Sequence, residues 1–342
     1  MSRKLITIST IMTLMSTSVI ADVPNVAADI APIHSLVSRV MDGVGAPKLI
    51  VQSGASPHGY RLRPSEAKAL QDADHVFWMG EELTPWLDSA IGTLASKASV
   101  TTLLDQEGII LHDFREGALF EAHDHSAHGD DDHDDHDDHD DHKDHDDHDD
   151  HDDHDDHKDH DDHDDHDDHD DHGSHDPHAW LSPENAKLWL NIIASKLSVS
   201  DPENAATYFM NAAAGQAEIE AMIAEVKATL KPVQGGKFVV FHDAYQYFEN
   251  DFDFYASGAI SLGDSSDPSP ARIEKVQKRI RDEGIQCVLA EPQFKKGLVA
   301  TVMEGSDATA SVIDPLGAEL ETGPKLYTRL IKNMAKTLRN CL

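Results

Sequence analysis

Residues 130–172 consist almost entirely of the repeated triplet Asp-Asp-His, and the chemistry that these side chains share is metal binding. The tract holds 14 His, 27 Asp and two Lys in 43 residues. Imidazole nitrogens and carboxylate oxygens are ligands for borderline divalent cations such as zinc, so we expect many weak sites here. The histidines recur at every third position, as His133, His136, His139, His142, His145, His148, His151, His154, His157, His160, His163, His166, His169 and His172.

The same tract is not expected to fold. A three-residue period fits neither the face of a helix nor the face of a strand. Because the tract has no apolar residue to bury, we expect residues 123–175 to form a disordered insertion that gathers zinc. A solvated acidic linker without a metal role is the alternative. The tract holds 27 of the 64 acidic residues, and an acidic chain argues against nucleic acid or anionic lipid as partners.

The N-terminus has the pattern of a secretory signal peptide. A basic region at 2–4 precedes an apolar and hydroxyl-rich stretch at 5–20, and the small residue Ala21 follows. We therefore predict a signal peptide at residues 1–21, with cleavage after Ala21. The alternative, a membrane-spanning helix, is disfavoured by the short length and the Ser/Thr content. We expect an exported protein with no stable membrane insertion.

Two cysteines, Cys287 and Cys341, fit export to an oxidising compartment. We expect them to form a disulfide bond that ties the C-terminal helix to the second lobe. Closing a loop of roughly 54 residues would stabilise the folded state by about 4 kcal/mol, because the bond restricts the unfolded chain. The alternative is a pair of separate buried thiols.

Outside the tract, strand-like and helix-like segments alternate. Apolar runs with β-branched or aromatic residues predict strands at 48–51, 75–78, 237–241, 287–290 and 310–313. Helical patterns at 64–72 and 270–283 begin with proline near the first turn. This alternation predicts an α/β fold with parallel sheets.

One further helix is expected to be unusually long. An alanine-rich pattern extends from residue 201 to residue 230 and stops before Pro232. With a rise of 1.5 Å per residue, such a helix spans roughly 40 Å. We expect Asp201 to cap it and the helix to connect two lobes as a rigid strut.

Three histidines stand in settings that favour ligand binding. His58 lies in a Gly/Pro-rich loop after a strand, and His242 lies at the carboxyl end of another strand. His178 closes the triplet phase within an Asp-Pro-His-Ala-Trp-Leu segment that leads into a helix. Ligands in open α/β sheets collect beyond the carboxyl ends of strands. His34, His75 and His112 have no such setting and stay unassigned.

Three imidazoles form a good zinc shell that leaves a fourth position for oxygen. Asp314, directly after the strand at 310–313, is a candidate for that position. Because His58 and His178 precede the long helix and His242 follows it, a metal shared by all three would lie between lobes.

Five motifs occur in a recognisable order along the chain after residue 21. They are Gly54-Ala55-Ser56-Pro57-His58 with Leu62-Arg63-Pro64-Ser65, Asp176-Pro177-His178-Ala179-Trp180-Leu181, Phe241-His242-Asp243-Ala244-Tyr245, Ala290-Glu291-Pro292-Gln293-Phe294 and Asp314-Pro315-Leu316-Gly317. In these motifs the chain resembles the cluster-9 substrate-binding proteins, the metal-binding components of zinc and manganese ABC importers. Zinc-type members of this family also carry a His- and acid-rich insertion in the first lobe.

The resemblance implies two Rossmann-like lobes with parallel sheets, joined by one backbone helix, with metal in the cleft between them. The N-terminal lobe would span residues 22–200 with the insertion at 123–175, the linking helix 201–231 and the C-terminal lobe 232–342. By this resemblance, His58, His178 and His242 match the three His ligands of the family. Asp314 matches a carboxylate that is a ligand in manganese-type members and is less certain in zinc-type ones.

The resemblance also implies a function. We expect a periplasmic, monomeric protein that captures Zn²⁺ with high affinity and delivers it to a membrane permease driven by a separate ATPase. The insertion would gather zinc for the cleft. His242 favours zinc, because manganese-type members usually have a carboxylate there and oxygen ligands suit Mn²⁺.

Three alternatives remain open at this point. They are a manganese-type binding component, a periplasmic zinc buffer without a transporter, and a zinc hydrolase that would need a placed general base. The sequence contains neither an H-E-x-x-H nor a G-x-x-x-x-G-K-[ST] motif. We therefore expect a binding protein, not an enzyme.

Overall fold

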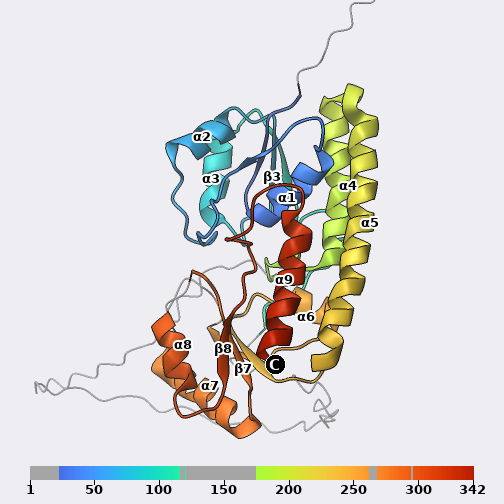
Figure 1. The fold of residues 1–342 in the computed structure, drawn as a ribbon. Coiled ribbons are helices and arrows are strands. Elements are labelled where there is room, and N and C mark those ends of the chain that lie inside the picture. The colour runs from blue at the N-terminus through green and yellow to red at the C-terminus, as the bar shows by residue number, and fades with distance from the viewer. Residues whose placement is uncertain (1–22, 116–119, 121–174, 262–267, 294–295) are drawn as a thin grey trace, which may run out of the picture. The chain divides into compact units, whose positions relative to one another are not determined.

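The computed structural model describes residues 23–115, 120, 175–261, 268–293 and 296–342 (Figure 1). The predicted signal peptide and the 14 histidines of the Asp-Asp-His tract lie outside the described residues. The residues described before the tract and those after it belong to one compact unit. None of the helices within these described ranges is long and apolar enough to cross a membrane.

The N-terminal sheet has four parallel strands in the order β2-β1-β3-β4. The strands are β1 (Val26–Ala28), β2 (Lys48–Leu49), β3 (His75–Trp78) and β4 (Ser99–Thr102). The helices α1 (Ala31–Val40), α2 (Pro64–Gln71) and α3 (Pro85–Leu94) connect them. Every residue of β1 and β3 is buried, as expected for parallel strands covered by helices on both faces.

The C-terminal sheet repeats this strand order as β6-β5-β7-β8, again all parallel. Its strands are β5 (Phe238–His242), β6 (Ala259–Ser261), β7 (Cys287–Ala290) and β8 (Thr309–Val312). The associated helices are α6 (Gln246–Phe252), α7 (Pro270–Glu283), α8 (Lys296–Met303) and α9 (Leu326–Cys341). In each sheet the chain starts at an inner strand and later adds strands on both sides. The carboxyl end of that strand is the position where doubly wound sheets bind ligands.

A long helix links the two sheets in sequence. The helix α4 (Pro183–Ser200) is followed by the 3₁₀ turn η3 (Pro202–Asn204), by α5 (Ala205–Leu230) and by the 3₁₀ turn η4 (Lys231–Val233). In Figure 1, α5 runs beside α4 and extends along α9, and it packs against both of these helices. The predicted α/β class with two parallel sheets and one long helix is thus confirmed.

The predicted cap on the long helix is wrong. The buried Asp201 carboxylate accepts hydrogen bonds from the Asn204 amide and the Tyr208 hydroxyl, both at 2.7 Å, and makes no cap bond to the backbone. The reason is that η3 separates Asp201 from the first turn of α5.

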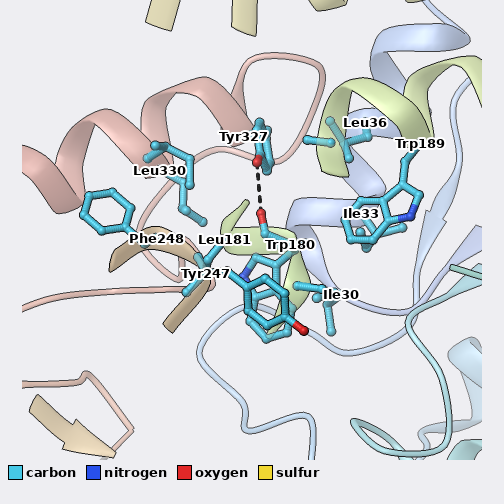
Figure 2. Close-up of a cluster of buried hydrophobic side chains, with 14 of the residues drawn as sticks. Ile30, Ile33, Leu36, Trp180, Leu181, Trp189, Tyr247, Phe248, Tyr327 and Leu330 are labelled. Atoms are coloured by element: carbon cyan, nitrogen blue, oxygen red, sulfur yellow. Dashed lines mark hydrogen bonds between the residues drawn. The ribbon is translucent and has the colours of Figure 1, made fainter. Parts of the chain in front are cut away.

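Buried aromatic side chains fix the segment that carries His178 (Figure 2). Trp180, in the 3₁₀ turn η2 (Ala179–Leu181), donates from its indole nitrogen to the Pro315 carbonyl at 2.8 Å. Its own carbonyl accepts from the Tyr327 hydroxyl at 2.9 Å. Both aromatic side chains are at most 1% exposed. The segment after His178 is therefore held by the loop that follows β8 and by α9.

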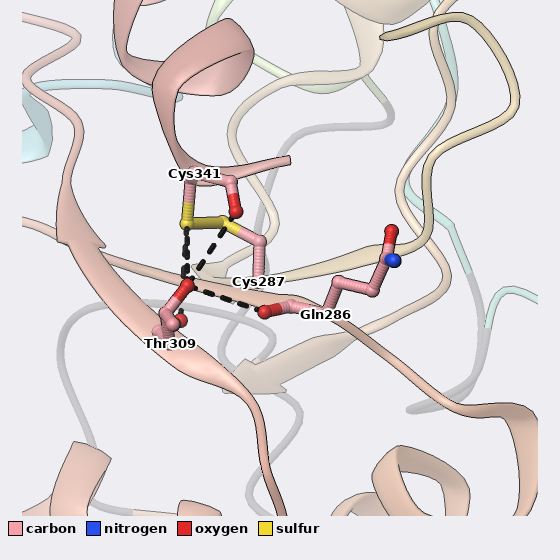
Figure 3. The surroundings of a disulfide bond; sticks show 4 residues. All are labelled: Gln286, Cys287, Thr309 and Cys341. Carbon is pink, nitrogen blue, oxygen red and sulfur yellow. Dashed lines mark hydrogen bonds between the residues drawn. A yellow bond between two sulfur atoms is a disulfide. The ribbon is translucent and has the colours of Figure 1, made fainter.

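The predicted disulfide is confirmed (Figure 3). Cys287 in β7 is bonded to Cys341 at the end of α9, with 5.6 Å between their Cα atoms. The hydroxyl of Thr309 in β8 lies 3.6 Å from the Cys341 sulfur. The bond thus joins α9 to the middle of the C-terminal sheet.

Candidate metal centre

Three imidazoles converge at one point. One ring nitrogen from each of His58, His178 and His242 lies within 4.8 Å of the ring nitrogens of the other two. His178 and His242 are 5% and 3% exposed, whereas His58 is only half-buried. The site therefore combines two nitrogens held in the protein interior with a third that is closer to solvent.

The elements that position the three histidines differ in kind. His242 is the last residue of β5, so its backbone is fixed by pairing with β6. His178 immediately precedes η2, which leads into α4. His58 lies in the connection between β2 and α2. The structure brings the three predicted candidates together, although His178 and His242 are 64 residues apart in the sequence and lie on opposite sides of α5 in the chain.

Buried carboxylates orient two of the rings. The Nδ1 atom of His242 donates to Glu291 at 2.6 Å, and the Nδ1 atom of His178 donates to Asp176 at 2.6 Å. Both acceptors are at most 2% exposed. An imidazole that donates from Nδ1 to a carboxylate keeps its Nε2 lone pair for a metal and becomes a stronger ligand.

The spacing of the freed nitrogens fits zinc. The Nε2 atoms of His178 and His242 lie 3.3 Å apart. At a zinc–nitrogen distance of about 2.0–2.1 Å, the corners of a tetrahedron are roughly 3.3 Å from one another. These two nitrogens therefore already stand at the separation that a tetrahedral zinc ion requires.

Asp314 is not one of the three residues grouped by ligand distance. Its carboxylate lies in the loop after β8 and accepts backbone N–H groups of Leu316 and Gly317 at 3.0 and 2.8 Å. Its second oxygen accepts the N–H of Ala318 at 2.6 Å. These bonds close a turn, so the carboxylate has a structural role whether or not it also reaches a metal.

The histidines that the sequence left unassigned have other partners. The Nε2 atom of His34 lies 3.1 Å from the Pro47 carbonyl, and burial lowers the pKa of this imidazole. His75 contacts the Ser200 hydroxyl at 2.7 Å, and His112 contacts the Asn250 amide at 3.2 Å. The 14 histidines proposed as weak ligands lie outside the described residues.

Sequence reasoning did not assign roles to the residues that surround the three histidines. Glu291 and Asp176 stand within the family motifs, and the position of a carboxylate two residues before His178 is the signal from which the role of Asp176 could be inferred. Tyr245 is also buried here, and burial together with the charge of Glu291 raises its pKa well above the ordinary value. Its aromatic ring lies 6.4 Å from that of His242. The carboxylates of Asp176 and Glu291 and the neutral phenol of Tyr245 thus lie beside two of the three imidazoles.

The fold and the site define a two-lobed metal-binding protein. Two parallel β-sheets are linked by a long helix, and the three imidazoles come from segments before and after that helix in the sequence. The chain belongs to the family described as zinc-uptake complex component A, periplasmic, whose family model matches residues 26–341. The family resemblance seen in the sequence motifs is confirmed by this match.

Known proteins agree with this assignment. The chain is 49% identical over 317 residues to the high-affinity zinc uptake system protein ZnuA of Brucella abortus, covering 93% of this chain and 91% of that protein. A crystal structure of ZnuA superimposes with a TM-score of 0.68 at 20% identity, covering 94% of this chain and 99% of the other. A zinc-bound ZnuA that lacks its residues 138–173 gives a TM-score of 0.67 at 20% identity, covering 94% and 98%. The two solved structures show the same fold.

Proposed function

We propose that this protein captures Zn²⁺ with high affinity in the periplasm and delivers it to an ABC-type zinc importer. His58, His178 and His242 are the proposed ligands, and Asp314 or a water oxygen would complete the shell. The observation that carries the proposal is the 3.3 Å separation of two buried Nε2 atoms. Each of the two rings donates from Nδ1 to a buried carboxylate, which fixes the rings for a metal before it arrives.

Membership of a zinc-uptake family supports the proposal of importer partners. A component of a zinc uptake system needs a membrane permease and an ATPase, and we propose both as partners of this chain. The lobes would be residues 22–200 and 232–342, joined by the linking helix at 201–231. The insertion at 123–175 would gather zinc weakly and leave tight binding to the three histidines.

Residue chemistry argues against two of the other functions, the manganese-type component and the zinc hydrolase. A manganese site would suit more oxygen ligands than three imidazoles provide. A zinc hydrolase would need a base beside the metal. The carboxylates of Asp176 and Glu291 instead accept hydrogen bonds from the ring nitrogens of His178 and His242. We therefore propose binding and transfer of zinc without catalysis.

The first experiment compares zinc affinity in three forms of the protein by competition with a strong chelator. His242→Ala should abolish tight binding, because it removes a buried nitrogen ligand. His75→Ala is the control, since this histidine bonds to Ser200 outside the group of three. A variant that lacks residues 121–172 should still bind one zinc ion tightly. These bounds retain the β-bridge between Asp113 and His175.

Two results would contradict the proposal. Equal zinc affinity in wild-type protein and His242→Ala would remove the chemical basis of the site. Loss of tight zinc in the folded deletion variant would move the principal site into the insertion.

A further inference from the structure

An arginine near the site joins the two chain segments that carry His178 and His242. The Nε atom of Arg115 donates to both carboxylate oxygens of Asp243 at 3.0 Å. Its Nη1 atom donates to Glu249 at 2.6 Å. The arginine side chain is 17% exposed, and those of Asp243 and Glu249 are 7% and 2% exposed. This is a largely buried cluster in which one cation faces two anions.

One end of this cluster is tied to His242. Asp243 follows His242 directly at the end of β5, and Glu249 lies in α6. By binding both carboxylates, Arg115 fixes the turn between β5 and α6. Without the guanidinium, two buried negative charges would face each other, which is costly in a medium of low dielectric constant.

The other end is tied to His178. Two residues before Arg115, Asp113 forms an antiparallel bridge with His175. The N–H of Asp176 donates to the His112 carbonyl at 2.8 Å, and the Asp176 carboxylate accepts from the His178 ring. The segment that carries Arg115 therefore runs beside the segment that carries His178.

The helix α6 strengthens this connection. The Tyr247 hydroxyl donates to the Asp176 carbonyl at 2.7 Å and accepts from the N–H of His112 at 3.1 Å. The Asn250 amide lies 3.2 Å from the His112 ring. Three side chains of α6, including that of Glu249, thus hold the same pair of segments against the turn after β5.

We infer that Arg115 is a positioning residue for the metal centre, which sets the separation between His178 and His242 through Asp243 and Glu249. This inference rests on the proposed function. Partners bonded directly to metal ligands typically contribute ten- to a hundred-fold in metal affinity. Because Arg115 acts one contact further from the ligands, its loss should weaken zinc binding by roughly ten-fold, the low end of that range. The zinc affinity of Arg115→Lys should fall between those of wild type and Arg115→Met. Lysine retains the charge but loses the planar fork that reaches both carboxylates.

A charge-matched double variant separates positioning from simple stabilisation. Arg115→Met leaves two unpaired carboxylates, whereas Arg115→Met with Glu249→Gln restores the net charge of the native cluster. We expect the double variant to recover stability towards unfolding by urea, relative to Arg115→Met, while zinc affinity stays weak. Arg39→Met is the control, because Arg39 pairs with Glu218 between α1 and α5.

The experiment measures zinc affinity by chelator competition and the visible absorption of bound Co²⁺, which reports tetrahedral geometry, in each full-length variant. An altered Co²⁺ spectrum and weakened zinc in both Arg115→Met forms support the inference. Affinity within about twofold of wild type, or recovery of affinity in the charge-matched variant, overturns it. If wild-type protein and His242→Ala bind zinc equally, the proposed function itself has failed, whatever Arg115 does.

Discussion

At the scale of single residues, the candidate site depends on carboxylates as much as on histidines. Glu291 lies 49 positions after His242 in the sequence, yet its carboxylate is the partner of the His242 ring. Gln293 in turn donates to the second oxygen of Glu291 at 2.7 Å. This chain of hydrogen bonds sets the tautomer and the direction of a buried imidazole before any metal binds.

Glu291→Gln should therefore weaken zinc binding by roughly ten-fold or more, because an uncharged acceptor makes His242 a poorer ligand. Chelator competition measures the change. Glu218→Gln is a suitable control, since Glu218 pairs with Arg39. Wild-type affinity in Glu291→Gln would mean that the carboxylate does not assist the metal site.

A second buried carboxylate predicts a dependence of stability on pH. Asp29, fully buried at the end of β1, accepts the N–H groups of Ile30 and Met79 at 2.7 and 2.6 Å. Burial nevertheless raises its pKa to about 7. The folded state thus holds this proton more tightly than the unfolded chain, in which the pKa is about 3.9.

The sign of the effect follows from that difference. As the pH rises from about 4 to 7, the unfolded chain releases the proton first, so the stability contributed by protonated Asp29 is lost across this window. The loss should reach up to about 4 kcal/mol, since each pKa unit corresponds to about 1.4 kcal/mol. Urea unfolding at pH 5 and pH 8 should show a smaller decrease for Asp29→Asn than for wild type. Asp72→Asn, at an exposed pair with Lys68, should keep the wild-type decrease in the free energy of unfolding. An equal decrease in wild type, Asp29→Asn and Asp72→Asn would exclude this role of Asp29.

At the scale of elements, the sequence predicts the strands that lie in apolar runs with β-branched or aromatic residues. Such runs predict β2, β3, β5, β7 and β8, although only Lys48–Leu49 of the run at 48–51 pairs as a strand. The strands β1 and β6 have only three residues each, with two alanines in β1, and β4 is largely exposed. These strands form because neighbouring strands pair with them. A local sequence pattern does not reveal such pairing.

The same limit applies to the site. The three histidines were identifiable because each stands in a loop or at a strand end near glycine, proline or aspartate. Glu291, the partner of His242, and Arg115, the partner of Asp243 and Glu249, cannot be assigned from the sequence, because their contacts join segments that come together only in the folded chain.

The disulfide is expected to act on the stability of the C-terminal sheet and α9. Replacing Cys287 and Cys341 by serine should lower the free energy of unfolding by about 4 kcal/mol, because a bridge across 54 residues restricts the unfolded chain. Urea unfolding without reductant measures the loss. Zinc affinity of the folded variant should stay near that of wild type, because the bond lies outside the ligand group. A large loss of affinity in folded protein would instead connect α9 to the metal centre.

At the scale of the whole molecule, the proposed ligands lie before and after α5 in the chain. A zinc ion bound by His58, His178 and His242 would therefore join segments from both sheets. Unfolding either sheet would remove ligands, so binding energy should add to the stability of the entire described unit.

Zinc should consequently raise the free energy of unfolding by about 2.7 kcal/mol when free zinc exceeds its dissociation constant a hundred-fold. The Asp-Asp-His tract should add little, because a tract that binds metal equally in folded and unfolded chains does not shift the equilibrium between them. Thermal unfolding at fixed free zinc, in wild type, His242→Ala and the variant lacking residues 121–172, measures both effects. We expect the gain to be lost in His242→Ala and kept in the deletion variant. A gain that survives His242→Ala but disappears with the tract would show that metal stabilises this protein through the insertion and not through the three converging imidazoles.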